Sequence, residues 1–118
     1  MNSGLASSFL PLSPAILHIL LALAAEERHG YAIMQEISQH SQGQYKIGPG
    51  TLYDNLQKMM SQGLVEESRR AGPDEDSRRR YYRLTRLGRS VLAAEVNRLE
   101  DVVREAKARL KPLLGGRS

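Results

Sequence analysis

The chain has no cysteine and no tryptophan, and phenylalanine occurs once in its 118 residues. Without cysteine there is no disulfide scaffold, no cysteine-based zinc site and no thiol nucleophile, and the composition fits the reducing cytoplasm, where we expect the protein to work. A glycine-rich phosphate loop is also absent. His18, His29 and His40 are each eleven residues apart, which is not a metal-ligand spacing on a helix. We therefore expect no enzyme activity, no metal site and no cofactor.

Hydrophobic runs long enough for a membrane are missing as well. The stretch from Phe9 to Ala25 has no formal charge, but its seventeen residues are at the lower limit for spanning a bilayer, and Pro11 and Pro14 interrupt it. Met1 to Ser8 contains no basic residue, which a signal peptide would need before its apolar run. We expect neither membrane insertion nor export.

What the sequence does have is a local excess of positive charge. The net charge is +4, from 17 basic and 13 acidic residues. Between Arg69 and Arg89 eight arginines stand against three acidic residues, so this segment carries +5 and the rest of the chain −1. A charge run is often only a solvated face, but an excess confined to one segment indicates an anionic partner, with nucleic acid ahead of anionic lipid.

Capping and turn residues divide the chain into elements. Ser13-Pro14 and Gly48-Pro49 are helix starts, because proline at the first helical position loses no hydrogen bond, and Gly63 is a stop signal. Apolar residues recur at helical spacing after each start, and two strand-like runs flank a turn at 71–74. In order, we expect a tail (1–12), a helix from Ser13-Pro14, a helix at about 31–40, a helix from Pro49 to Gly63, strands at 64–69 and 79–84, a long helix within 85–114 and a disordered end (115–118).

Three helices followed by a hairpin and a long helix make a mainly α fold with a small β-hairpin, of the α+β class. This order of elements is typical of a winged helix-turn-helix domain, here over residues 13–84, with a long C-terminal dimerisation helix over residues 85–114. In such a domain the third helix enters the major groove of DNA. We expect the arginines of the hairpin, or wing, to lie along the flanking backbone or in the minor groove.

The apolar stripe of the third helix determines which of its side chains are free for DNA. Leucine or methionine recurs at positions 52, 56 and 59, and at about 100° per residue the polar residues between them lie opposite or beside that stripe. Thr51, Asp54 and Asn55 are then placed to reach base edges, and Lys58, one turn further on, to reach a phosphate. The free N–H groups near Gly50 also favour a phosphate oxygen.

The long helix carries a second pattern. Its apolar residues are spaced alternately four and three apart over three heptads. A helix of about twenty-five residues is roughly 37 Å long, more than a core of this size covers, so we expect a partner chain to cover it. The predicted dimer seam consists of Leu92, Val96, Leu99, Val103, Ala106, Leu110 and Leu113.

Several short motifs, in this order, resemble the PadR family of bacterial transcriptional regulators over about residues 12–92. They are His29-Gly30-Tyr31-Ala32-Ile33, Gly48-Pro49-Gly50-Thr51-Leu52-Tyr53, Gly63-Leu64-Val65, and Tyr81-Tyr82-Arg83-Leu84-Thr85 with Gly88. The single C-terminal helix is similar to that of the family's shorter subgroup. The resemblance implies a homodimer on operator DNA, usually a repressor and often released by a small molecule.

By the same resemblance, Thr51 and Tyr53 and the basic residues before Tyr81 fall at DNA-contacting positions. The sequence departs from the family in two places: Gly48 stands where relatives often have serine, and the wing tip at 74–76 is acidic. From the residues alone, Tyr53 is as well explained by packing beside the core stripe as by a phosphate contact. The predicted DNA-contacting residues are Lys46, Gly50, Thr51, Tyr53, Asp54, Asn55, Lys58, Arg69, Arg78, Arg79 and Arg80.

Two alternatives stay open at this point. A winged-helix fold does not fix a function, so a protein-interaction module without DNA binding is the rival, although the arginine cluster favours DNA. The scarcity of aromatic residues argues against an effector site that stacks large planar molecules. A small or aliphatic effector near Phe9, Leu10 and Leu12, or none, is the expectation.

Overall fold

The computed structural model describes residues 3–68 and 80–113. The wing turn with its acidic tip, the predicted DNA contacts Arg69, Arg78 and Arg79, and the predicted disordered end lie outside these residues. The elements are α1 (Ser3–Ser7), α2 (Pro14–Ala24), β1 (Arg28–His29), α3 (Gly30–His40), α4 (Pro49–Ser61), β2 (Val65–Ser68), β3 (Tyr81–Leu84) and α5 (Arg86–Leu110).

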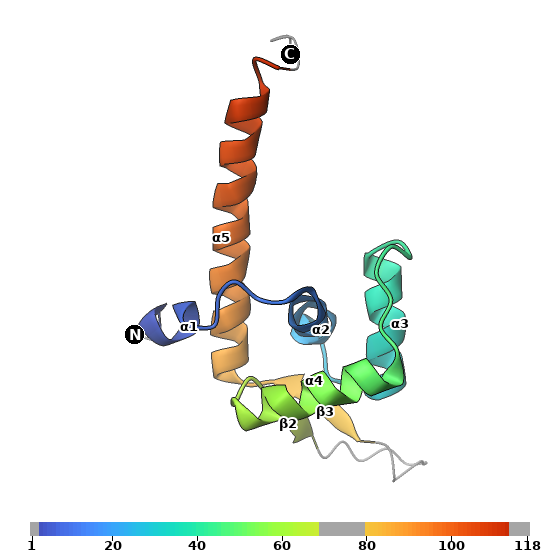
Figure 1. Cartoon of the computed structure of the whole chain (residues 1–118). Coiled ribbons are helices and arrows are strands. Elements are labelled where there is room, and N and C mark those ends of the chain that lie inside the picture. The colour runs from blue at the N-terminus through green and yellow to red at the C-terminus, as the bar shows by residue number, and fades with distance from the viewer. Residues whose placement is uncertain (1–2, 69–79, 114–118) are drawn as a thin grey trace.

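The described chain is mostly helical with a small antiparallel sheet, and it has the predicted winged helix-turn-helix architecture. α2, α3 and α4 pack together, the sheet lies beneath α4, and α5 projects away from them as a long rod (Figure 1). This projection makes the molecule elongated, with extents of 58 × 35 × 23 Å. α3 and α4 form the helix-turn-helix pair. Its second helix, α4, is called the recognition helix, and it lies at the surface (Figure 1).

The predicted helix starts are confirmed. Pro14 is the first residue of α2, and the Ser13 side chain accepts a hydrogen bond from the amide of Ile16 at 3.3 Å. Pro49 begins α4 after Gly48, which has no side chain to cap the helix. The predicted stop also holds, because Gly63 adopts a φ of +78°, a left-handed conformation that glycine reaches without a steric penalty.

The sheet has one strand more than predicted. Its order is β1-β3-β2, with both pairs antiparallel. β1 consists only of Arg28 and His29, which pair with Tyr82 and Tyr81. Two polar residues cannot display the alternation by which a strand is recognised in sequence, so β1 is absent from the prediction.

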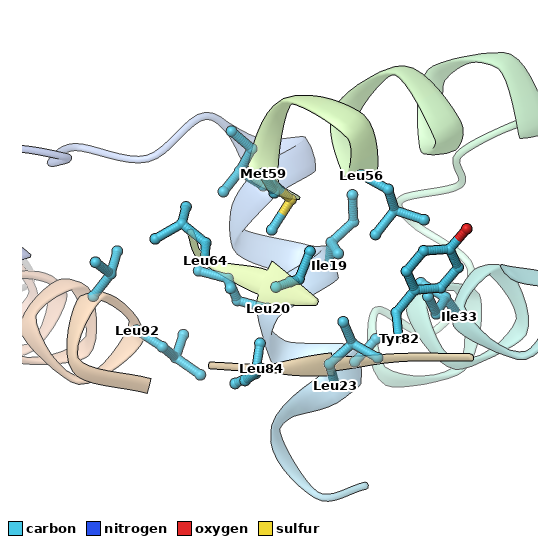
Figure 2. Packing of buried hydrophobic residues seen from close by; sticks show 14 of the residues in the cluster. Ile19, Leu20, Leu23, Ile33, Leu56, Met59, Leu64, Tyr82, Leu84 and Leu92 are labelled. Carbon is cyan, nitrogen blue, oxygen red and sulfur yellow. The ribbon is translucent and has the colours of Figure 1, made fainter. Parts of the chain in front are cut away.

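One continuous core joins the helices to the sheet. Ile19 and Leu20 of α2 and Ile33 of α3 have no exposed surface, and α4 contributes Leu56 and Met59 from its predicted stripe. Figure 2 shows these side chains meeting those of β3 and the start of α5. α2 is therefore central to the core, as its nearly all-round apolar sequence predicts.

The N-terminal segment, predicted as a tail, contains the short helix α1. α1 packs on α5, and its Ala6 is buried. Further along, the amide of Leu12 donates a hydrogen bond to Oε2 of Glu95, at 3.1 Å. Five residues are too few to show a helical period, so the sequence gives no signal for α1.

Glu95 is the buried carboxylate of α5, with 1% of its surface exposed. Arg98 binds both of its oxygens, with N···O distances of 2.6 and 2.9 Å. The hydrogen bonds from Arg98 hold the pKa of Glu95 below its ordinary value, although burial acts in the opposite direction and the amide of Leu12 adds to the lowering. Glu95 thus remains charged and fixes the N-terminal segment to α5.

The segment that follows α4 is hydrogen-bonded to the residue that caps the start of α5. The Thr85 amide donates to the carbonyl of Leu64 at 3.0 Å, and the Thr85 hydroxyl caps α5 by accepting from the amide of Gly88, also at 3.0 Å. A Cβ on Gly88 would lie 3.1 Å from the carbonyl carbon of Leu64 and closer still to its oxygen. Only glycine permits this approach, which fixes the direction of α5 relative to the recognition helix.

Candidate nucleic-acid interface

The recognition helix α4 presents a polar face to solvent. Its stripe of Leu52, Leu56 and Met59 is buried, which turns the intervening positions outward. The exposed members of the predicted DNA-contacting set on or just before this helix are Lys46, Gly50, Thr51, Tyr53, Asp54 and Lys58. The helix therefore brings most of the predicted contacts onto one accessible surface.

Asn55 differs from its neighbours. It is half-buried, and its side-chain amide donates a hydrogen bond to the carbonyl of Thr51, 2.9 Å away. One of its donors is therefore already used within the helix. A base contact by Asn55 would need its other polar atoms or a change of rotamer.

Tyr53 makes a packing contact, which was one of the two roles that the sequence allowed for it. Its ring end packs over Gly30, the first residue of α3, where a Cβ would lie 2.7 Å from Cζ of the tyrosine. Tyr53 nevertheless remains 45% exposed. It packs the recognition helix against the N-terminus of α3 and still presents surface beside Thr51 and Asp54.

The described arginines of the sheet are paired with carboxylates. Arg83 binds Glu66, with Nε and Oε2 2.8 Å apart, and Arg80, the one described member of the predicted wing contacts, lies 3.5 Å from Oε2 of Glu67. Arg28 is largely covered and donates to the carbonyl of Ala22 at 2.7 Å. These internal pairings reduce the charge that the wing base offers to an anion.

Two histidines that are distant in sequence meet in the fold. Nδ1 of His18 in α2 and Nε2 of His40 in α3 are 2.9 Å apart, and the ring of Tyr45 stacks on His18 with centroids 4.5 Å apart. Burial, with His40 adding to it, lowers the pKa of His18. Because the two residues come from different helices, their spacing along the chain gave no signal of this contact.

Two features of other functional classes are absent from the part of the chain that the structure describes. Within residues 3–68 and 80–113 there is no group of three histidine, aspartate or glutamate side chains placed to hold a metal ion. None of the helices in the two described ranges is long and apolar enough to cross a membrane.

The predicted dimer seam begins in the core and continues into solvent. Leu92 is buried and Leu99 is half-buried, whereas Val103, Leu110 and Leu113 are 50%, 46% and 78% exposed. A groove of about 460 Å³ on this side of α5 is lined by Val96, Leu99 and Val103, with Glu100, Arg104 and Lys107 at its edges. The described chain thus leaves an apolar stripe uncovered along the projecting part of α5.

Comparison with known proteins agrees with this architecture. The model of the transcriptional regulator PadR-like family matches residues 16–94. The transcriptional regulator Rv3488 of Mycobacterium tuberculosis is 39% identical over 103 residues, covering 86% of this chain and 84% of the relative.

Solved structures show the same fold. A PadR-like transcriptional regulator from Bacillus cereus superposes with a TM-score of 0.70 at 23% identity, covering 81% of this chain and 90% of the other. RosR of H. salinarum superposes with a TM-score of 0.61 at 27% identity, covering 86% and 99%. From the family match over most of its folded part and from its relative in M. tuberculosis, the chain belongs to the PadR-like family of transcriptional regulators.

Proposed function

We propose that this regulator is a cytoplasmic homodimer that represses transcription by binding an inverted-repeat operator in double-stranded DNA. The observation that carries the proposal is α5, in which every residue from 100 to 110 is exposed although Val103 and Leu110 are among them. Apolar surface left in water costs about 25 cal/mol for each Å². A second copy of α5 along the same stripe would remove this cost and give the dimer a two-fold axis.

A two-fold dimer presents two copies of α4. The operator is then an inverted repeat whose half-site centres are about one helical turn, or a multiple of it, apart. Thr51, Asp54 and Asn55 read base edges in this arrangement, while Lys58 and Lys46 contact phosphates. The N–H groups at Gly50 and the hydroxyl of Tyr53 add contacts to the backbone, as do the wing arginines at 69, 78, 79 and 80.

The effector in this proposal is small or aliphatic. A groove of about 640 Å³ between α1 and α5 is lined by small and aliphatic residues such as Ala6, Leu10 and Ala94 and by polar ones that include Arg98 and Asp101, and none of its lining residues is aromatic. Stacking of a large planar molecule is therefore unsupported there. Release of operator DNA by planar dyes at micromolar concentration would contradict this part of the proposal.

Two measurements on the purified chain test the proposal. Sedimentation is expected to give a dimer, and a fragment of DNA from upstream of the gene that encodes the chain is expected to shift at physiological salt. A scrambled duplex of the same length is the control and is expected to bind far more weakly. A chain that shifts neither duplex, even at low salt, would instead be the protein-interaction module.

A further inference from the structure

Adjacent glutamates of β2 hold two arginines on opposite faces of the sheet. Glu66 is the register partner of Arg83, with which it forms the shorter ion pair, at 2.8 Å. Glu67 is the register partner of the buried Tyr82, and its carboxylate lies 3.5 Å from Nη1 of Arg80. Because side chains alternate across a strand, Glu67 and Arg80 lie on the core side with Tyr82, and Glu66 and Arg83 lie on the other side.

The side that carries Glu67 is also the side of the recognition helix. Figure 2 shows the ring of Tyr82 projecting from β3 toward α4. The pKa of Tyr82 is raised mainly by burial and further by Tyr53 and Glu67, while Arg80 acts in the opposite direction. Tyr82 thus lies within electrostatic range of Tyr53 of α4 as well as of Glu67 and Arg80, which agrees with the Glu67–Arg80 pair being on the face of the sheet that α4 covers.

We propose that Glu67 limits the affinity of this protein for DNA by competing with a backbone phosphate for Arg80. The inference rests on the proposed DNA binding and adds to it a residue that weakens binding to any sequence. Arg80 is suited to a phosphate, since its planar guanidinium forms two parallel hydrogen bonds with such an oxyanion. A phosphate that takes this position must displace the Glu67 carboxylate and then remain close to a like charge.

The exposure of the pair makes the exchange possible. The side chains of Arg80 and Glu67 are 70% and 46% exposed. An exposed ion pair at this distance is weak, so a phosphate can displace it. The repulsion between Glu67 and the phosphate persists after displacement, and it acts whatever the base sequence, because phosphate contacts carry no sequence information.

Neighbouring Glu66 provides a matched control. Glu66→Gln and Glu67→Gln change the net charge by the same amount in the same strand, but only Glu67→Gln frees an arginine beside α4. The probes are a fragment from upstream of the gene that encodes the chain and a scrambled duplex of equal length. Glu67→Gln is expected to bind both roughly three- to tenfold more tightly than the wild type, and Glu66→Gln less than about twofold more tightly.

A second background separates pairing from general charge. In Arg80→Gln protein, the gain from Glu67→Gln is expected to shrink, because no arginine remains to be released and only the repulsion between Glu67 and the phosphate is relieved. Thermal melts of all variants identify any that fold poorly, and both glutamates are exposed enough for the exchange to be tolerated.

The outcomes are distinct. Equal affinities for Glu67→Gln and Glu66→Gln, or a gain from Glu67→Gln that is as large without Arg80 as with it, would overturn the inference while leaving DNA binding intact. If the wild type and every variant fail to bind either duplex at low salt, the proposed function itself fails.

Discussion

α2 and the second half of α5 both carry aliphatic side chains at helical spacing, but most of those of α2 are covered, whereas those of α5 from residue 100 onward are exposed. Ile19 and Leu20 lie wholly inside the core, whereas no residue from 100 to 113 is buried. The pattern in α2 is completed by α3, α4 and the sheet of the same chain. The pattern in α5 extends beyond any element of the described chain (Figure 1). The same sequence signal therefore belongs to a core in one place and to an exposed stripe, the proposed dimer interface, in the other, and the length of the helix distinguishes them.

The largest effect is expected where the chain completes its own core. Leu20→Ala removes a fully buried side chain and should lower the free energy of unfolding by about 2–5 kcal/mol, measured by urea titration. Leu110→Ala, at a position that is 46% exposed, is the matched change in the uncovered region. It should instead raise the protein concentration at which the dimer dissociates. A similar loss from both changes, independent of protein concentration, would remove the distinction between the two regions.

Charge in the seam tests the uncovered region directly. Leu99→Asp places a carboxylate where the partner is expected to be apolar, which costs several kcal/mol if it is buried there. The variant should keep its helices by circular dichroism, sediment as a monomer and bind operator DNA at least about a hundredfold more weakly, or about 2.7 kcal/mol. Ala108→Asp, on the opposite side of the helix, should leave the protein dimeric and its affinity for operator DNA unchanged. If Leu99→Asp protein stays dimeric and binds DNA, the seam is not the interface.

A glycine substitution tests the covered region next to the surface proposed to bind DNA. Gly30→Ala would force its Cβ into the ring of Tyr53, so it should cost about 1–3 kcal/mol of stability and weaken DNA binding by moving α4. Gly4→Ala is the control, because nothing lies within 4 Å of its added Cβ. Combining Gly30→Ala with Tyr53→Ala should recover part of the lost stability. Without such recovery, the close approach is not what requires glycine.

Most of the fold could be predicted from interactions between residues close together in the sequence. The part that could not be predicted depends on contacts between distant segments. Ser13-Pro14, Gly48-Pro49 and Gly63 act within one turn of the chain, and each predicted boundary held. Alternation along β3 accounts for the burial of Tyr82, which lies between the half-buried Tyr81 and the exposed Arg83. β1 and α1 were missed because they are too short to show a period, and they form by pairing with β3 and packing on α5.

The candidate site was less predictable for the same reason. The exposure of Thr51 and Lys58 follows from the helical period of α4 alone. The pairing of Arg80 with Glu67 and the meeting of His18 with His40 depend on how two elements pack. A run of arginines in a sequence therefore overstates the charge that is free for DNA.

A smaller effect is expected from a single phosphate contact. If the dimer neutralises six to eight phosphates, log K should fall with log[salt] at a slope of roughly −5 to −7. Lys58→Ala should flatten that slope by about 1–2 and weaken all sequences alike, whereas Thr51→Ala should change base preference. Fluorescence anisotropy titrations at several salt concentrations give the slopes. A slope near zero in the wild type would exclude an electrostatic role for the basic segment.

The smallest effect concerns the histidine pair, which joins α2 to α3 in the covered region. The pKa of His18 is lowered in the folded chain by burial and by His40, so the unfolded chain takes up a proton more readily. The contribution of His18 to the free energy of unfolding is therefore fully present above the ordinary histidine pKa of about 6.5, and it is lost as pH falls below that value. His18→Gln cannot titrate, and its urea midpoint should fall less between pH 7.5 and 5.5 than that of the wild type. His40 and Tyr45 are the titratable groups that face His18, and both are retained in the variant. Because the pair lies within one chain, the difference should not depend on protein concentration, unlike any effect of the α5 seam. An equal fall in both proteins would show that His18 does not contribute to acid sensitivity.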